Sequence, residues 1–284
     1  MQSDLFKKLN SPLAPIPSGQ NAKLTNLSDI RAVIFDIYGT LVISGTGDIS
    51  IAQKVDREEV LSGFLTATGS EIPPDFSVSD VFYKLIKEDH ENSQALGASY
   101  PEVDILEIWT RLVLKLRRNP PDEETLKFMA IRFECAVNPV WPMPGLESVL
   151  ESLSKRGMPL GIVSNAQFYT PIMLESFTGK RLSELGFQED LSVWSYRERL
   201  GKPSVELFEK LNRSLSSRGI RPEQALYVGN DMLNDIWTAS QAGLKTALFA
   251  GDQRSLRLRE TDDRCQGLEP DVVITELNQL VHIL

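Results

Sequence analysis

The chain has 284 residues, 42% of them hydrophobic, and a formal net charge of -9 at pH 7. This length and apolar content suffice to bury a sizeable core, so we expect a globular protein with one large domain or two moderate ones. The acidic charge disfavours nucleic acid and anionic membrane surfaces as partners, because both are themselves negatively charged.

The sequence contains neither a run long enough to cross a membrane nor the apolar core of a signal peptide at its start. Its two cysteines, Cys135 and Cys265, are too few and too far apart for a disulfide framework or a zinc site. A reducing, cytoplasmic location is therefore predicted.

The first part of the chain changes character twice. Residues 1–29 contain several prolines and no sustained hydrophobic period, which predicts an N-terminal extension, either weakly ordered or docked as an arm. The apolar run at 32–35 predicts a buried parallel strand with the carboxylate of Asp36 at its end. Residues 44–48 predict a loop, and from about 50 to 138 apolar residues recur only with helical spacing, which predicts an inserted all-helical domain.

The rest of the chain alternates between strand and helix patterns. This alternation predicts right-handed crossovers and a mainly parallel sheet. The expected fold class is α/β, with a Rossmann-like, doubly wound sheet core at 30–43 and 139–284 and the helical domain at 44–138 inserted into it. Strands are predicted near 160–163, 191–195, 225–229, 245–249 and 271–274, and helices near 146–157, 167–177, 204–217, 232–242 and 275–283.

Polar clusters follow three of the predicted strands, where a doubly wound sheet would bring them together. Each cluster alone is weak, since an Asp or Asn after a strand is more often a turn former or a helix cap. A lysine before a helix is likewise usually a solvated charge. The combination is more specific, and it predicts a site. Its members are Asp36, Ser164 with Asn165, Asn230 with Asp231 and Asp235, and the lysine of Gly201-Lys202-Pro203.

These four elements in this order resemble the haloacid dehalogenase superfamily, from about residue 31 to the C-terminus, with the helical insertion at the position of that family's C1 cap. The resemblance implies a hydrolase acting on a small anionic substrate enclosed between cap and core. It also implies roles for individual residues. Asp36 corresponds to the nucleophile, with Thr40 in the same motif; Ser164 or Asn165 to the group that binds the transferred group; Lys202 to the cation that steadies Asp36; and Asp36, the Tyr38 carbonyl, Asp231 and Asp235 to the ligands of Mg²⁺.

The chemistry of these groups is consistent with those roles. A carboxylate can attack phosphorus or carbon if cations offset the crowding of like charges, and Mg²⁺ with a lysine would do so in phosphoryl transfer. Mg²⁺ prefers oxygen ligands and takes few of them from protein, so Asp36, a carbonyl two residues on and one further acid would suffice.

Two departures from the family pattern limit this interpretation. Family phosphatases carry a second acid where this chain has Tyr38, and that acid protonates the leaving group. A phenol, with a reference pKa of about 10, is a poor replacement. The Asp-x-Tyr-Gly-Thr motif resembles instead the metal-independent L-2-haloacid dehalogenases. In the last motif, Asn230 stands where the first acid is usual in one register, although Asp231 and Asp235 keep an acid pair four residues apart.

Three functions stay open at this point. Mg²⁺-dependent hydrolysis of a phosphate ester is the leading hypothesis, metal-independent dehalogenation is the second, and a catalytically weak binding or regulatory protein is the third. His90 is expected at a helix end or in a solvated loop, with a place on the cap where substrate is selected as the alternative. Arg254, Arg257 and Arg259 are expected at the start of a surface helix, with anion binding as the alternative.

Overall fold

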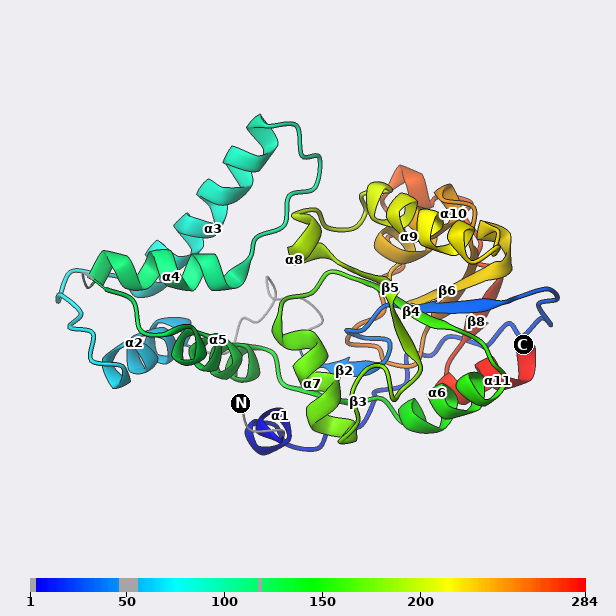
Figure 1. The fold of residues 1–284 in the computed structure, drawn as a ribbon, viewed down its shortest axis with the longest axis horizontal. Coiled ribbons are helices and arrows are strands. Elements are labelled where there is room, and N and C mark those ends of the chain that lie inside the picture. Colours follow the sequence, from blue (N-terminus) through cyan, green and yellow to red (C-terminus); the bar gives the residue numbers. More distant parts are fainter. Residues whose placement is uncertain (1–3, 46–55, 117–118) are drawn as a thin grey trace.

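The computed structural model describes residues 4–45, 56–116 and 119–284. Its centre is a sheet of six parallel strands in the order β5-β4-β1-β6-β7-β8, so the first strand of the chain lies between its fourth and its sixth (Figure 1). This order confirms the predicted α/β, Rossmann-like class. The strands are β1 (Ala32–Phe35), β4 (Leu160–Ser164), β5 (Phe187–Trp194), β6 (Ala225–Gly229), β7 (Lys245–Phe249) and β8 (Val272–Ile274).

Helices cover both faces of this sheet, because alternate side chains of each buried strand point to opposite sides. Val33 and Phe35 of β1 pack in one core with α1, α6, α7 and α11, whereas Ala32 and Ile34 pack in another with α9 and α10. The helices are α1 (Leu5–Leu9), α6 (Leu146–Lys155), α7 (Tyr169–Thr178), α8 (Ser195–Glu198), α9 (Glu206–Ser217), α10 (Thr238–Gln241) and α11 (Leu280–Ile283), with single 3-10 turns at Pro222–Gln224, Asp263–Cys265 and Leu277–Gln279.

Four of the helices between β1 and β4 form a separate layer, which we call the cap (Figure 1). They pack around their own apolar core, in which the rings of Phe82, Trp109 and Phe133 lie 5.4 to 5.8 Å apart between centroids. The chain passes out to the cap and back through two paired antiparallel strands, which we call the hairpin. The cap helices are α2 (Arg57–Ala67), α3 (Val78–Ala95), α4 (Ile105–Leu116) and α5 (Glu123–Val137), and the hairpin strands are β2 (Val42–Ser44) and β3 (Val140–Pro142). The predicted loop at 44–48 lies mostly outside the described residues.

The described part of the N-terminal extension is a docked arm, one of the two alternatives that the sequence left open. Its helix α1 lies against both α5 and α7 (Figure 1), with Phe6 fully buried between cap and core. Asn10 donates to the Cys135 sulfur in α5 at 3.4 Å and accepts from the Val140 amide in β3 at 2.9 Å. Further along, Lys23 pairs with Val273 of β8.

Three predicted elements differ from the structure. β5 begins at Phe187 rather than near 191. The helix predicted at 232–242 is a π-helical turn (Met232–Trp237) followed by the short α10, because the Asp231 carbonyl accepts from the amides of both Asp235 and Ile236. Such π turns are frequent at functional sites. The last helix is reduced to a 3-10 turn followed by α11. None of the described helices combines the length and apolar character that a membrane crossing requires.

Candidate active site

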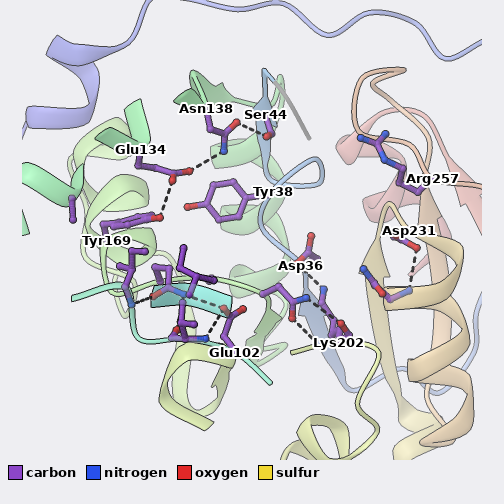
Figure 2. Close-up of a pocket in the computed structure, with 18 of the residues that line it drawn as sticks. Asp36, Tyr38, Ser44, Glu102, Glu134, Asn138, Tyr169, Lys202, Asp231 and Arg257 are labelled. Carbon is purple, nitrogen blue, oxygen red and sulfur yellow. Dashed lines mark hydrogen bonds and ion pairs between the residues drawn. The ribbon is translucent and has the colours of Figure 1, made fainter. Parts of the chain in front are cut away.

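Asp36 and Lys202 form the centre of the site (Figure 2). Asp36 directly follows β1, and its amide donates to the Val228 carbonyl of β6 at 2.9 Å. The buried Lys202 ammonium donates to Asp36 Oδ1 at 2.8 Å, to Asp235 Oδ1 at 2.5 Å and to the Tyr227 hydroxyl at 2.9 Å. Burial alone would lower the pKa of Lys202, but the carboxylates of Asp235 and Asp36 outweigh it and raise that pKa. The lysine is therefore a permanent cation beside the nucleophile candidate.

Asp235 is held in place by its whole surroundings. Its Oδ2 accepts from the amides of Asn230 and Asp231, both at 2.9 Å, and its Oδ1 accepts from Lys202 and from the Tyr227 hydroxyl. Burial raises the pKa of Asp235, and the charge of Lys202 opposes that rise. Gly229 is required beside it, because a Cβ there would overlap the Asp235 carboxyl group. Asp235 therefore positions Lys202 and closes the turn after β6.

Asp231 lies on the other side of this turn and is engaged by an arginine. Its Oδ2 accepts from Arg259 Nη2 at 2.6 Å, and both of its oxygens accept from Arg259 Nε at 3.1 Å. Its Oδ1 also caps the π-helical turn by accepting from the amides of Leu233 and Asn234. The prediction that Arg254, Arg257 and Arg259 begin a surface helix is wrong, since residues 254–259 are not helical and pair with the turn after β6 instead.

The side chains expected to hold Mg²⁺ do not form a ready site. Asp36 and Asp235 share the Lys202 ammonium, and Asp231 is paired with Arg259. Across residues 4–45, 56–116 and 119–284, no three acidic, histidine or cysteine side chains are grouped as metal ligands. Asn230, in the position of the usual first acid, binds the Thr40 hydroxyl and the Ser255 carbonyl. As arranged, these residues do not fit a divalent ion.

Tyr38 is a partly buried neighbour of Asp36 rather than an acid or a base. Its ring points away from Asp36, toward Glu134 and Tyr169 (Figure 2), and its hydroxyl hydrogen bonds to Thr170 Oγ1 at 3.0 Å. Burial raises the pKa of Tyr38 well above its ordinary value, and the nearby Glu134 raises it further. The phenol therefore keeps its proton at neutral pH.

The remaining predicted site residues have supporting places. Asn165 accepts from the Lys202 amide at 2.7 Å and donates to the Lys202 carbonyl at 3.2 Å, so it fixes the loop that carries the lysine. Thr40 is fully buried and donates to Asn230. Ser164 is also fully buried, and its hydroxyl has no hydrogen-bond partner among the described residues. Thus the structure gathers Asp36, Lys202 and Asp235 and places the others around them.

A cavity of about 460 Å³ lies between these residues and the cap. Its core side carries three carboxylates and three cations, whereas its cap side is largely apolar. His90 of α3 faces this cavity rather than bulk solvent, and its Nε2 has no partner within the described part of the chain. The charged lining residues of the core are Asp36, Asp231, Asp235, Lys202, Arg257 and Arg259, and the apolar ones of the cap include Phe82, Ile86, Ile105, Ala130 and Phe133.

Sequence reasoning missed the buried acid on the cap side. Glu134 of α5 is 4% exposed and accepts from the Tyr169 hydroxyl at 2.8 Å and from Asn138 Nδ2 at 3.0 Å. Burial raises its pKa. Asn138 in turn accepts from the Ser44 hydroxyl at 2.7 Å, at the hairpin. The available signal was a charged residue four positions after Ala130, on the apolar face of its helix.

Known proteins resemble this chain over most of its length. A family model of haloacid dehalogenase-like hydrolases matches residues 30–243. The glyceraldehyde 3-phosphate phosphatase of Pyrococcus furiosus is 27% identical over 259 residues, which cover 90% of this chain and 93% of the relative. The protein of the same name from Methanothermobacter thermautotrophicus is 26% identical, with 90% and 100% covered. A crystal structure of a 2-haloacid dehalogenase from Pseudomonas syringae superposes with a TM-score of 0.55 at 19% identity, covering 89% of this chain and 97% of that one.

Three findings agree with one another. The Asp36–Lys202 pair lies at the carboxyl end of the central strand, the sheet around it is doubly wound, and the family model matches more than half of the sequence. This chain belongs to the haloacid dehalogenase-like hydrolases.

Proposed function

We propose that the protein hydrolyses phosphate monoesters of small molecules, with Asp36 as the nucleophile. The observation that carries the proposal is the Asp36 carboxylate, buried at the end of β1 and bound through Oδ1 to the Lys202 ammonium at the floor of the cavity. Within the described residues Oδ2 has no hydrogen-bond partner, which leaves it free to attack. The relatives named glyceraldehyde 3-phosphate phosphatase support a phosphate ester as the substrate.

The reaction would have two steps. Asp36 Oδ2 forms a bond to phosphorus while the ester P–O bond breaks, and the departing oxygen takes a proton from water in the cavity. The hydroxide left by that water then attacks phosphorus and cleaves the aspartyl phosphate, which releases inorganic phosphate and restores the carboxylate. Lys202 offsets the charge that accumulates next to Asp36. Arg257 lines the cavity, and in the described part of the chain it is paired with no carboxylate, so it is the cation we assign to the substrate's phosphoryl oxygens.

The other predicted site residues and the predicted domain boundaries are also part of this proposal. Of Ser164 and Asn165, Asn165 is the one that lines the cavity, so it would contact the transferred group. Thr40 would hold the turn after Asp36 through Asn230. The core would comprise 30–43 and 139–284, the cap 44–138, and residues 1–29 the extension. A small anionic molecule is the proposed partner, and the cytoplasmic location stays a prediction.

Magnesium has no role in this reaction, because its expected ligands are engaged by other groups. Of its expected ligands, Asp231 is bound by Arg259, and Asp235 by Lys202, Tyr227 and two amides. No step proposed above uses a metal ion.

Tyr38 favours a second candidate function, the metal-independent hydrolysis of a carbon–halogen bond. Its phenol holds its proton at neutral pH and is too weak an acid to protonate a leaving group, because burial raises its pKa. A halide leaves without being protonated, so this reaction has no need of a general acid. An enzyme of this kind would use Asp36 and Lys202 in the same way.

A substrate panel distinguishes the two functions and the alternative of a binding protein. Purified protein is assayed against small phosphomonoesters and L-2-haloacids, each with Mg²⁺ and with chelator, and Asp36→Asn serves as the inactive control. Release of phosphate that Asp36→Asn abolishes supports the proposal. Release of halide alone supports the dehalogenase, and turnover by neither class leaves the binding role.

A further inference from the structure

Arg259 holds Asp231 through three contacts of 2.6 to 3.1 Å, of which two come from Nε and one from Nη2. The Asp231 side chain is 9% exposed and that of Arg259 is 39% exposed. Paired hydrogen bonds between a guanidinium and a carboxylate are among the strongest that side chains make. The pair is also at the cavity wall, since both residues line it.

The backbone around Arg259 is tied to the acidic turn at several points. The Met232 amide donates to the Arg257 carbonyl at 2.8 Å, and the Arg257 amide donates to the Asn230 carbonyl at 3.0 Å. Asn230 Nδ2 donates to the Ser255 carbonyl at 2.7 Å. Arg259 itself has a φ of 55°, in the left-handed region that few residues other than glycine adopt. A non-glycine residue persists there only when its surroundings fix it, so the backbone that carries the guanidinium is held by the fold.

We propose that Arg259 is a resident cation that takes the place of a divalent metal ion at Asp231. In this chain two side chains then supply the positive charge of the site. Lys202 neutralises Asp36 and Asp235, and Arg259 neutralises Asp231. The effect of Arg259 on activity depends on the proposed function. The exclusion of metal ions from Asp231 does not depend on it.

The donor chemistry around the turn agrees with this assignment. Mg²⁺ requires several oxygen ligands in near-octahedral geometry. Asn230 supplies a neutral amide where an acid would be expected, and its oxygen accepts from Thr40. Both oxygens of Asp235 already accept hydrogen bonds, from Lys202, from the Tyr227 hydroxyl and from two backbone amides of the turn. Asp231 would have to release Arg259 before it could bind an ion, and the released guanidinium would repel that ion at close range.

Manganese binding tests the proposal without any reference to turnover. Mn²⁺ is titrated into the full-length parent, Arg259→Met and the matched control Arg264→Met, and the free ion is followed by its electron paramagnetic resonance signal. Arg264 also pairs with a carboxylate, Asp262, at 2.8 Å, and it is 37% exposed. We expect Arg259→Met to bind Mn²⁺ more tightly than the parent and the control by about tenfold or more, because a charge-assisted pair no longer competes. Equal binding by all three proteins would overturn the proposal.

Two further measurements keep the result decisive. Circular dichroism establishes that Arg259→Met is folded, and Arg259→Gln replaces it if it is not. The aryl phosphatase rate of the parent is then measured after dialysis against EDTA. An unchanged rate supports the proposal, and a rate that falls and is restored by Mg²⁺ overturns it. If the parent hydrolyses no phosphate at all, the proposed function has failed, while the manganese titration still decides whether Arg259 excludes the metal.

Discussion

Removal of the Lys202 ammonium should destabilise the folded protein far more than removal of an exposed lysine. The side chain is 3% exposed, and its ammonium is shared by Asp36 and Asp235. Lys202→Met keeps the length of the side chain but leaves two buried carboxylates without a counter-charge. Breaking a buried pair in this way costs about 3–5 kcal/mol in the free energy of unfolding.

The loss should depend on pH. Without the lysine, the folded-state pKa of Asp235, raised already from 3.8 to about 6, rises further because burial is no longer opposed. An acid whose pKa is higher in the folded state than in the unfolded state loses stability as pH rises between the two values. The variant should therefore lie closer to the parent at pH 5 than at pH 8.

Urea unfolding of both proteins at these two pH values measures the effect. Lys245→Met is the matched control, because Lys245 contacts Asp271 at the same 2.8 Å as the contact of Lys202 with Asp36, but is 43% exposed. Its loss should cost about 0–1 kcal/mol at either pH. If Lys202→Met costs no more than this control, or costs the same at pH 5 and pH 8, the assigned charge balance is wrong. The double variant Lys202→Met with Asp235→Asn should recover part of the loss, since it removes one of the orphaned charges.

Three further predictions concern single side chains. Asp36→Asn should abolish hydrolysis while the thermal unfolding temperature is retained within a few degrees, since an amide of equal volume is not a nucleophile; activity within a few-fold of the parent would exclude Asp36 from that role. Tyr38→Asp should raise the hydrolysis of aryl phosphates by a factor approaching the roughly 10² to 10⁴ of a general acid, most for basic leaving groups; a neutral or harmful effect with every leaving group would favour a different reaction. Glu58 accepts from the amides of Val78 and Ser79 at the start of α3, and these bonds, with hydroxyl donors, lower its pKa from 4.5 to about 2 against its burial. Glu58→Gln should therefore lower the free energy of unfolding at pH 7 by about 1 kcal/mol, a difference that shrinks as pH falls from 4.5 toward 2, and a constant difference in urea titrations across that range would contradict it.

The parts of the site that could be predicted are those that follow from strand order. Asp36 and the turn before Asp235 come directly after apolar runs, and parallel strands place their carboxyl ends at the same edge of the sheet. The position of Lys202 followed only from resemblance, because nothing in a Gly-Lys-Pro sequence shows which carboxylates it will meet.

The contacts that escaped prediction join side chains whose local sequence indicates something else. Arg259 lies in a stretch of alternating charges that is typical of a solvated helix, and its partner Asp231 is 28 positions away. Phe6 lies among polar residues and prolines, so its burial against α5 and α7 depends entirely on the finished fold. The partners of Glu134 were also unpredictable, because this charged residue lies on an apolar helix face and its hydrogen bonds to Tyr169 and Asn138 exist only in the folded structure.

The docked arm ties together parts of the molecule that a hairpin alone would leave free to turn. The cap is connected to the core through β2 and β3, whereas α1 contacts the cap through α5 and the core through α7. Asn10 adds hydrogen bonds to both α5 and β3. A rotation of the cap about the hairpin must therefore either break these bonds or carry α1 away from α7, where Lys7 donates to Ser176. In mechanical terms residues 4–10 act as a brace across the hinge. The entrance to the cavity is therefore stiffened by a segment none of whose described residues lines it.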